Sequence, residues 1–297
     1  HLLNFANQKP RQIKFRNFTK KLSLMKIAIF CAFDTPETIE YALATVSYLE
    51  KKGHELDLDS RLIEYISNPI NHTQFEASGT INLDIDFLFS IGGDGTLLRS
   101  IPFVKDSKIP ILGINTGRLG FLTSLQKETL NEALDEFFDE KFKLVERSLL
   151  SVALSDADHA LNNSFSFALN EISINRMNTT SMLSIQTKIN EEYLTTYWAD
   201  GLIIATSTGS TGYSLSSNGP ILTPETKGII LNPIAPHNLN IRPLVVPDEV
   251  AIKISVDGRG DGYLMSLDSR LFSVENGSSI TIKKAAFPVF TVELNGD

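Results

Sequence analysis

A glycine-rich loop with an embedded acid carries the sharpest chemical signal of the sequence. The loop spans residues 90–96, reads S-I-G-G-D-G-T, and follows an apolar run typical of a buried strand. Glycine lets the backbone adopt positive φ and brings its amides close to a ligand. The amides of Gly92, Gly93, Gly95 and Thr96, with a helix expected from Thr96 onward, would form an anion site suited to phosphate.

Asp94 gives this loop its chemical interest. A loop that only turned, or only bound an anion, would not place a carboxylate against phosphates. An acid at this position can hold a metal ion or take a proton from an attacking hydroxyl. The alternative is a strand-to-helix turn in which Asp94 merely caps the helix. The sequence contains neither a Walker A pattern nor G-x-G-x-x-G, so the P-loop and Rossmann interpretations lose their usual support.

A second polar segment runs through residues 199–216, where an apolar strand leads into a loop of hydroxyl residues and glycines. Small hydroxyl residues supply donors and acceptors in little space, which suits ribose and phosphate oxygens. Tyr213 offers a flat apolar face for a base or a nicotinamide ring. Composition alone is equally consistent with a plain surface loop.

The elements that must position these motifs change in pattern near Phe142. Before it, short apolar runs alternate with helical patterns, which predicts a parallel sheet with flanking helices. One helix is expected from the capping residue Thr35 to Gly53, and another after Gln126. Strands are expected at residues 26–30, 85–91 and 109–114.

Beyond Phe142 the chain consists of short runs rich in Ser, Thr, Ile and Val, which predicts an all-β second domain. Strands are expected at residues 149–154, 165–175, 183–189, 193–197, 202–206, 250–256 and 280–283, with a hairpin turn at 189–193. The expected domains are an α/β domain at 25–143, an all-β domain at 144–282, and a C-terminal segment at 283–297 that can return to the first domain.

Residues 1–24 stand apart because they contain six Lys or Arg residues and no acid. A transit peptide, a tag remnant or a start codon assigned too early would each explain this basic leader. The 297-residue chain has a formal net charge of −8, so the remainder is strongly acidic. An acidic body argues against nucleic acid as a partner, because phosphate backbones are held by basic surface.

Membrane and metal signals are weak in the sequence. No apolar stretch approaches the roughly 20 residues that span a bilayer, so no membrane partner is expected. The single cysteine, Cys31, lies in an apolar run and is interpreted as a buried thiol in a reducing cytoplasm. The five histidines show no metal-ligand spacing, and no protein metal site is assigned.

Three segments, in their order along the chain, resemble the hallmark segments of the NAD kinase family. They are the 92–96 loop, Asn170-Glu171, and residues 206–213. Residues 114–123, 146–150 and 232–239 look like family segments as well, so the resemblance runs from about Met25 to the C-terminus. Diacylglycerol and sphingoid kinases and phosphofructokinases carry close relatives of the glycine loop, whereas the Thr-Gly-Ser-Thr-x-Tyr segment is more specific to NAD kinases.

The resemblance implies a role for each matching residue. Asp94 looks like the catalytic residue that accepts the proton of the ribose 2′-hydroxyl. Asn170 and Glu171 match the pair that holds adenine and ribose hydroxyls, whereas Asp200 and Ala235 match contacts near the nicotinamide half. All positions that match the NAD site are Asp94, Gly95, Arg99, Asn170, Glu171, Asp200, Thr211, Gly212, Tyr213, Ser216 and Ala235. The all-β domain is therefore expected to bind NAD.

Three positions depart from the family pattern. Ser207 stands where proline is usual, which is expected to loosen the loop slightly. Gly212 stands where alanine is usual, a small change that keeps close approach possible. Arg270 sits where the family often has a glutamine after Asp-Gly or Asp-Ser. We expect the Arg270 side chain to be solvated rather than to replace the contact of that glutamine.

The expected function is an NAD kinase that transfers the γ-phosphate of ATP to the 2′-hydroxyl of the adenosine ribose of NAD. Mg²⁺ or another divalent cation is the implied cofactor, and a homodimer or homotetramer is implied as the assembly. Inorganic polyphosphate stays open as donor, and NADH as acceptor. The rivals are a lipid kinase, for which residues 208–216 are too polar, and a non-catalytic dinucleotide sensor, against which Asp94 argues.

Overall fold

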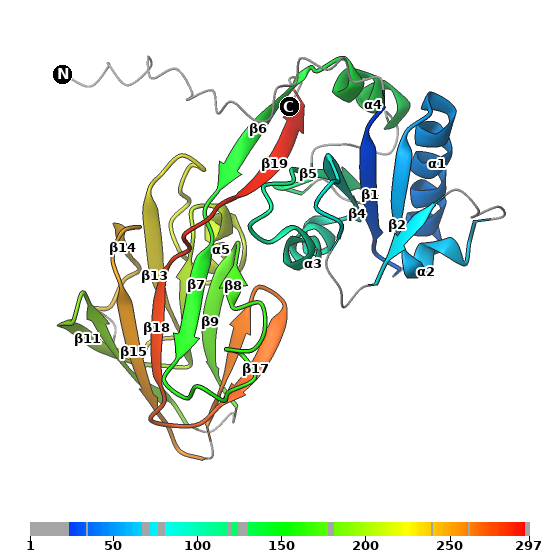
Figure 1. Ribbon diagram of the computed structural model, residues 1–297. Helices are drawn as coiled ribbons and strands as arrows, with labels where there is room; N and C mark the ends of the chain where they lie inside the picture. Colours follow the sequence, from blue (N-terminus) through cyan, green and yellow to red (C-terminus); the bar gives the residue numbers. More distant parts are fainter. Residues whose placement is uncertain are drawn as a thin grey trace, which may run out of the picture.

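The computed structural model describes residues 24–33, 35–66, 72–76, 81–117, 120–123, 130–177, 181–238, 240–260 and 262–294. Within these ranges the chain forms two sheet-based domains joined by two crossing segments (Figure 1). The basic leader predicted at 1–24 lies outside them, apart from Leu24. No helix in the described part of the chain is long and apolar enough to cross a membrane.

The first domain is built on a sheet with seven strands among the described residues. Their spatial order is β3 (Thr73–Phe75), β2 (Glu55–Asp59), β1 (Lys26–Cys31), β4 (Phe87–Gly92), β5 (Ile111–Asn115), β19 (Val289–Leu294) and β6 (Phe142–Arg147). Strands β1 to β5 and β19 pair in parallel, and among the described strands of this sheet only the β19–β6 pair is antiparallel. This mostly parallel sheet confirms the α/β class predicted for the first half.

Helices cover both faces of this sheet. α1 (Pro36–Lys52) and α4 (Leu130–Phe138) pack on the face that carries Ile27 and Ile29 of β1. α3 (Asp94–Val104) packs on the opposite face, against Ala28 and Phe30. The short α2 (Ser60–Ile63) follows β2. The period of two along β1 thus sends alternate side chains to different helices.

The ends of α1 follow the predicted signals. The Thr35 hydroxyl accepts a hydrogen bond from the Thr38 amide at 3.2 Å. Pro36 occupies the first helical position, and Gly53 ends the helix with a φ of 86°. A side-chain cap, a proline that needs no amide partner and a left-handed glycine are the expected start and stop of a helix.

The second domain consists of two stacked sheets, each with six strands in the described residues. One has the order β11 (Glu192–Ala199), β10 (Leu183–Ile189), β15 (Ile252–Asp257), β18 (Ser279–Lys284), β7 (Leu150–Leu154) and β8 (Phe167–Ala168). The other has the order β14 (Leu244–Pro247), β13 (Gly228–Ile234), β12 (Gly201–Ala205), β9 (Glu171–Arg176), β16 (Tyr263–Leu267) and β17 (Arg270–Val274). One apolar cluster fills the space between them. The all-β class predicted for this half is confirmed.

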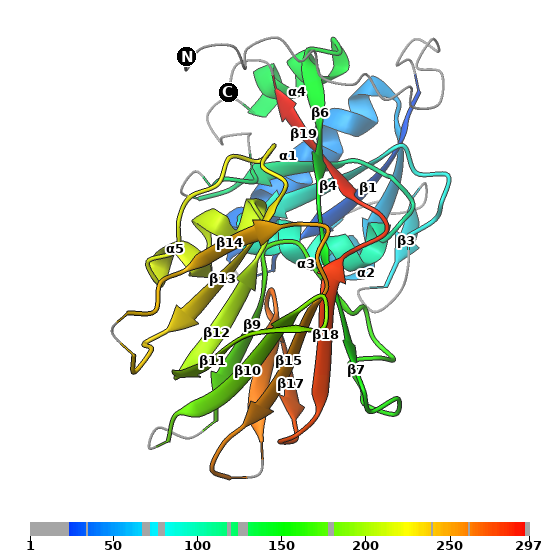
Figure 2. The same cartoon turned by 90° about the vertical axis from the view of Figure 1, so that its left-hand side faces the viewer.

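Two crossing segments join the domains side by side. β6 leads into β7, and β18 leads into β19, which pairs with β5 and β6 of the first sheet (Figures 1 and 2). Between them the Ala285 amide donates to the Leu149 carbonyl at 2.8 Å. Arg147 is buried and donates to Thr291 at 3.2 Å and to Glu293 at 2.8 Å. The first sheet therefore extends to Arg147, past the boundary predicted at residue 143.

An apolar cluster fills the junction of the two domains. From the first domain it includes Leu97 of α3 and Leu122, and from the second Leu169 and Phe167. Phe287, on the returning segment, contacts Phe167 with ring centroids 4.8 Å apart. The loops that carry the predicted chemistry are adjacent to these residues, so the junction sets their relative position.

Phe137 of α4 is the residue whose truncation tests the first core. It is fully buried, and its ring lies 4.9 Å from that of Phe87 and 5.0 Å from that of Phe142. Phe137→Ala should lower the free energy of unfolding by about 3–5 kcal/mol, because it opens a cavity among aromatic rings. Urea unfolding followed by circular dichroism measures this loss. The control Leu83→Ala, at a side chain 73% exposed, should change it by less than about 0.5 kcal/mol.

Candidate functional site

The glycine loop connects β4 directly to α3. Gly92 has a φ of 153°, and a Cβ atom there would lie 2.2 Å from the Thr96 hydroxyl, so only glycine fits. By contrast, a Cβ atom on Gly93 or Gly95 would meet no atom within 4 Å. The backbone of the loop is therefore open to a ligand, at the N-terminus of an 11-residue helix. The helix begins at Asp94, two residues before the predicted start at Thr96.

The Asp94 carboxylate is held by a neighbouring segment. It accepts hydrogen bonds from the amides of Phe121 at 2.8 Å and Leu122 at 3.1 Å, and from the Thr123 hydroxyl at 3.2 Å. Gly93 is the N-cap of α3 and no side chain caps the helix. The alternative in which Asp94 merely caps the helix is therefore wrong. A Cβ atom on Gly120 would lie 2.0 Å from the carboxylate, which shows how closely the two segments approach.

A second carboxylate, that of Asp268, organises the start of β9. It accepts the backbone amides of Leu169 at 2.9 Å, Asn170 at 2.8 Å and Glu171 at 3.2 Å. Burial raises the pKa of Asp268, against these three donors, which lower it. Three consecutive amides on one carboxylate fix the backbone of Asn170 and Glu171. No local pattern in the sequence indicates this role for Asp268, which lies 97 to 99 positions from the amides it accepts.

Asn170 and Glu171 present buried oxygen atoms without partners. Oδ1 of Asn170 and Oε2 of Glu171 are buried, and neither atom has a hydrogen-bond partner within the described part of the chain. Burial, with the nearby charge of Asp268, raises the pKa of Glu171 to about 8, while a hydrogen bond from the Tyr213 amide lowers it. Buried polar atoms are normally hydrogen-bonded, so unsatisfied ones in a native fold favour a ligand-binding position.

The predicted substrate segment forms a tight double turn against this pair. It comprises the 3₁₀ helix η3 (Thr208–Thr211) and the short helix α5 (Tyr213–Ser216). The Thr206 amide donates to the Asn170 carbonyl at 2.9 Å, and the Thr206 hydroxyl donates to Leu169 at 2.6 Å. A Cβ atom on Gly212 would lie 3.2 Å from Oε2 of Glu171. Gly212 and Tyr213 are thus brought together with Asn170 and Glu171, and Thr211 and Ser216 belong to the same double turn.

Asn232 of β13 holds this turn from below. Its side-chain amide is fully buried and donates to the carbonyls of Ser214 at 2.9 Å and Ser217 at 3.2 Å. A Cβ atom on Gly219 would lie 2.2 Å from the Ser214 hydroxyl, so the chain must pass closely here. Asn232 lies in the 232–239 segment that resembles the family, but its positioning role has no local signal in the sequence.

Asp200 and Ala235 lie apart from the other predicted residues. They occupy the opposite end of β12, where Gly201 pairs with Ile234, whereas Glu171 pairs with Ala205. At 3.3 Å per residue, the five positions from Asp200 to Ala205 span about 16 Å. Asp200 forms an ion pair with Arg176 at 2.9 Å, and Ala235 adopts a φ of 43°.

The prediction that Arg270 is solvated is wrong. Its guanidinium donates to the carbonyls of Phe165 and Phe167 and lies 5.2 Å from the centroid of the Phe165 ring. Burial lowers the pKa of Arg270, and the charge of Asp268 raises it. The physical reason is that Arg270 places its positive charge near the Asp268 carboxylate and donates hydrogen bonds to the backbone carbonyls of Phe165 and Phe167.

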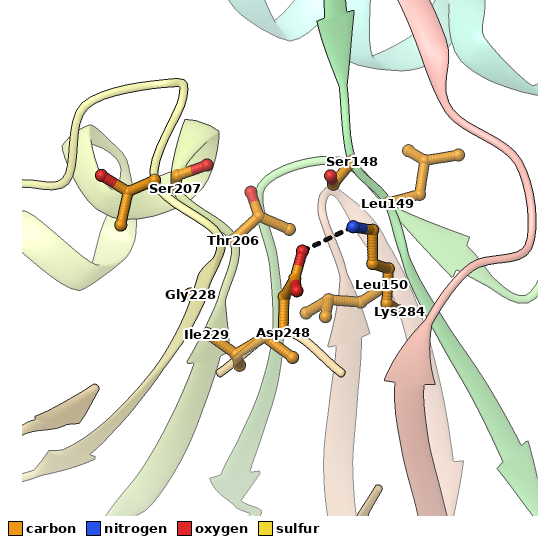
Figure 3. A pocket seen from close by; sticks show the side chains of 10 residues that line it. Ser148, Leu149, Leu150, Thr206, Ser207, Gly228, Ile229, Asp248 and Lys284 are labelled. Atoms are coloured by element: carbon orange, nitrogen blue, oxygen red, sulfur yellow. Dashed lines mark hydrogen bonds and ion pairs between the residues drawn. The ribbon is translucent and has the colours of Figure 1, made fainter. Parts of the chain in front are cut away.

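Ser207 is anchored where the family usually has proline. Its φ of −59° is close to the value that proline imposes, and its hydroxyl donates to the Pro224 carbonyl at 3.3 Å. Below it a small pocket is closed by an ion pair between Lys284 and Asp248, 2.5 Å apart (Figure 3). Lys284 is the last residue of β18, which leads into a crossing segment. The ion pair therefore also connects the pocket below Ser207 to the domain junction.

Among the described residues no group of three or more His, Cys, Asp or Glu side chains converges on one point. The acidic residue in the first turn of α3 is Asp94. Cys31 is buried, as predicted.

The raised pKa of Glu171 makes stability depend on pH. In the unfolded chain this carboxyl ionises near its ordinary value of 4.5, and in the folded protein near about 8. The folded state therefore holds the extra proton between these values, and stability falls as pH rises from about 4.5 to about 8. Glu171→Gln should flatten this fall and raise the thermal midpoint relative to wild type at pH 8–9. Midpoints measured from about pH 5 to 9, with the exposed Glu192→Gln as control, test it; parallel curves for wild type and Glu171→Gln would contradict it.

Comparison with known proteins assigns both halves of the chain to one family. The family model described as "ATP-NAD kinase N-terminal domain" matches residues 27–142, and the one described as "ATP-NAD kinase C-terminal domain" matches residues 169–294. The NAD kinase of Christiangramia forsetii is 44% identical over 278 residues, 92% of this chain and 94% of the relative. The NAD kinase of Flavobacterium psychrophilum is 44% identical over 274 residues, 91% of this chain and 93% of the relative.

Solved structures give the same result. A yeast NADH kinase complexed with NADH superimposes with a TM-score of 0.80 at 26% identity, covering 91% of this chain and 84% of the yeast chain. An NAD kinase from Archaeoglobus fulgidus in complex with ATP gives a TM-score of 0.66 at 26% identity, covering 90% of this chain and 92% of that chain. With both domain models matched and relatives above 40% identity along nearly its whole length, the chain belongs to the NAD kinase family.

Proposed function

We propose that this enzyme transfers the γ-phosphate of ATP to the 2′-hydroxyl of the adenosine ribose of NAD, which yields NADP and ADP. The observation that carries the proposal is the fixed Asp94 carboxylate beside an open glycine loop. Its neighbour across the junction is the turn that joins Asn170 and Glu171 to Tyr213. The names of the relatives, and the NADH and ATP bound in the two solved kinases, support the same pair of substrates.

The mechanism follows from the roles of these groups. A ribose hydroxyl is a poor nucleophile at neutral pH, so Asp94 accepts its proton as the oxygen attacks the γ-phosphorus. The bond between this phosphorus and the bridging oxygen breaks, and ADP leaves. Backbone amides from Gly92 to Gly95 hold the phosphates, while Asn170 and Glu171 accept hydrogen bonds from the adenosine. The three donors on Asp94 keep its carboxylate in place during the transfer.

Mg²⁺ or another divalent cation fits this site as a companion of the donor. Mg²⁺ is usually bound through one or two carboxylates together with substrate phosphates. The described residues offer Asp94 beside the glycine loop and no cluster of three ligating side chains. Asp94 and the donor phosphates would therefore hold the ion, which when bound offsets the charge that develops on the transferred phosphoryl group.

The proposal includes a homodimer or homotetramer in the cytoplasm, with no nucleic acid or membrane partner. The assembly is what membership of the NAD kinase family implies. The single cysteine, Cys31, is a buried thiol, which supports the cytoplasmic location. The net charge of −8 argues against nucleic acid as a partner. Light scattering that finds only monomers at micromolar concentration would contradict the assembly.

The test of function is a coupled assay with NAD, ATP and Mg²⁺, in which an NADP-specific dehydrogenase detects the product. Wild-type protein should form NADP. Asp94→Asn should lower kcat by about 100-fold or more, because proton removal is lost, while NAD binding measured by calorimetry stays within a few-fold. Near-wild-type turnover in this variant would exclude Asp94 as the base. Absence of NADP with wild-type protein, even with polyphosphate or NADH, would overturn the proposed function.

A further inference from the structure

The chain passes from one sheet of the second domain to the other at residues 169–171, the crossover. β8 ends at Ala168 as the last strand in the described order of one sheet, and β9 begins at Glu171 inside the other sheet. Leu169 and Asn170 belong to neither strand, so their backbone groups need partners from outside a strand ladder. The crossover thus has to be built by other parts of the chain.

Asp268 and Thr206 supply the partners of the crossover backbone. The Asp268 carboxylate accepts all three of its amides. The carbonyls of Leu169 and Asn170 accept the hydroxyl and the amide of Thr206, and the Glu171 carbonyl accepts the Asp268 amide at 3.0 Å. Every backbone group of the crossover is therefore bonded. The buried oxygens without a partner among the described residues are in its side chains, Oδ1 of Asn170 and Oε2 of Glu171.

Arg270 holds the chain that leads into the crossover. The Ser166 carbonyl accepts the Val152 amide at 3.0 Å and so points toward β7. Since neighbouring carbonyls of an extended chain point in opposite directions, those of Phe165 and Phe167 point away from β7. The Arg270 guanidinium donates to both of these carbonyls and lies 5.2 Å from the centroid of the Phe165 ring. Its planar set of donors suits two acceptors on one side of a strand.

Asp268 and Arg270 belong to one tight hairpin tip. β16 and β17 join there, with Leu267 paired to Arg270. Asp268 adopts a φ of 53°, and its carbonyl accepts the Ser266 hydroxyl at 2.7 Å. The charges of Asp268 and Arg270 act on each other. The tip therefore meets residues 165–171 with an anion at the amides and a cation at the carbonyls.

The segment held by this tip also contacts the first domain. The Phe167 ring lies 4.8 Å from that of Phe287 on the returning segment. Leu169 packs in the cluster that contains Leu97 of α3, the helix that follows the glycine loop. A displacement of residues 165–171 would therefore move the crossover side chains relative to α3.

We propose that Arg270 and Asp268 are positioning residues of the acceptor site, which hold residues 165–171 so that Asn170 and Glu171 meet the adenosine of NAD in one geometry. The inference rests on the proposed NAD kinase function and adds two residues that act on NAD through the backbone. Without them, NAD has to order the crossover as it binds, which lowers its affinity. The effect falls on NAD rather than on ATP.

Arg270→Met tests the proposal, because methionine keeps an unbranched side chain and removes the charge and both donors. In steady-state assays this variant should raise KM for NAD about tenfold, with KM for ATP within about twofold. Calorimetry should show the NAD dissociation constant rising by a similar factor. The matched control is Arg259→Met, at an exposed arginine in the bend between β15 and β16, which should change none of these values.

Asp268→Asn tests the other residue of the tip. The side chain keeps its shape but loses the charge that three amides share. The same selective rise in KM for NAD is expected, about tenfold or more. An unchanged KM for NAD in a folded Asp268→Asn would remove Asp268 from the proposal.

A double-mutant cycle separates positioning from general destabilisation. If Arg270 acts through the crossover, Arg270→Met should raise KM for NAD by less than about threefold once Asn170→Ala is present, whereas independent changes would multiply. General destabilisation would lower the thermal midpoint and the active fraction but leave both KM values unchanged.

The outcomes separate this inference from the proposed function. A folded Arg270→Met with an unchanged KM for NAD, with a KM for ATP that rises equally, or with factors that multiply in the cycle would overturn the positioning role. If Arg270→Met does not fold, Arg270→Lys, which keeps the charge but lacks the planar donors, should show the selective rise, and its absence would overturn the role. Wild-type protein that forms no NADP would overturn the function instead, and the NAD dissociation constants then decide the positioning role.

Discussion

The site depends on how the two domains are held against each other, because each contributes one half of it. The chain crosses the junction twice, and the crossings bond directly through the Ala285 amide and the Leu149 carbonyl. The buried Arg147 joins β6 to β19 through Thr291 and Glu293. β19 pairs with both β5 and β6, so the crossing segment that returns from the second domain is built into the first sheet. At the junction, Leu97 of α3 packs in one cluster with Leu169, the residue before Asn170.

Most of the fold could be predicted where side-chain pattern and local capping agreed. Strand β1 and helix α1 were found because an apolar run, a capping threonine and a terminal glycine follow one another. Strand β2 is not predicted, although Glu55, Asp57 and Asp59 alternate with its leucines as in a half-buried strand, because Asp and Glu are depleted in strands. The structure buries Asp57 and Asp59 all the same, and Arg61 compensates Asp59. Such pairing is a tertiary effect that a local pattern does not show.

The site could be predicted as a set of residues but not as a geometry. The spacing of Gly92 to Thr96 indicated a phosphate loop, and the resemblance indicated Asn170, Glu171 and Tyr213. The partners of Asp94, at Phe121 to Thr123, and the three amides on Asp268 are separated in sequence by 27 to 99 positions. Arg270 looked solvated because its carbonyl partners, Phe165 and Phe167, lie on a distant bend. Long-range hydrogen bonds of this kind leave no local sequence signal.

An acidic protein can bind polyphosphates because the field at a site depends on the nearest groups rather than on net charge. The chain carries a net charge of −8. At the carboxyl edge of the first sheet, however, the open backbone at Gly93 and Gly95 lies near the guanidinium groups of Arg61 and Arg99. Asp94 follows Gly93 directly, and its carboxylate is turned toward three donors from the 121–123 segment. In the proposed mechanism this carboxylate removes the proton of the ribose hydroxyl, and the three donors hold its negative charge in place at the edge of the proposed anion site.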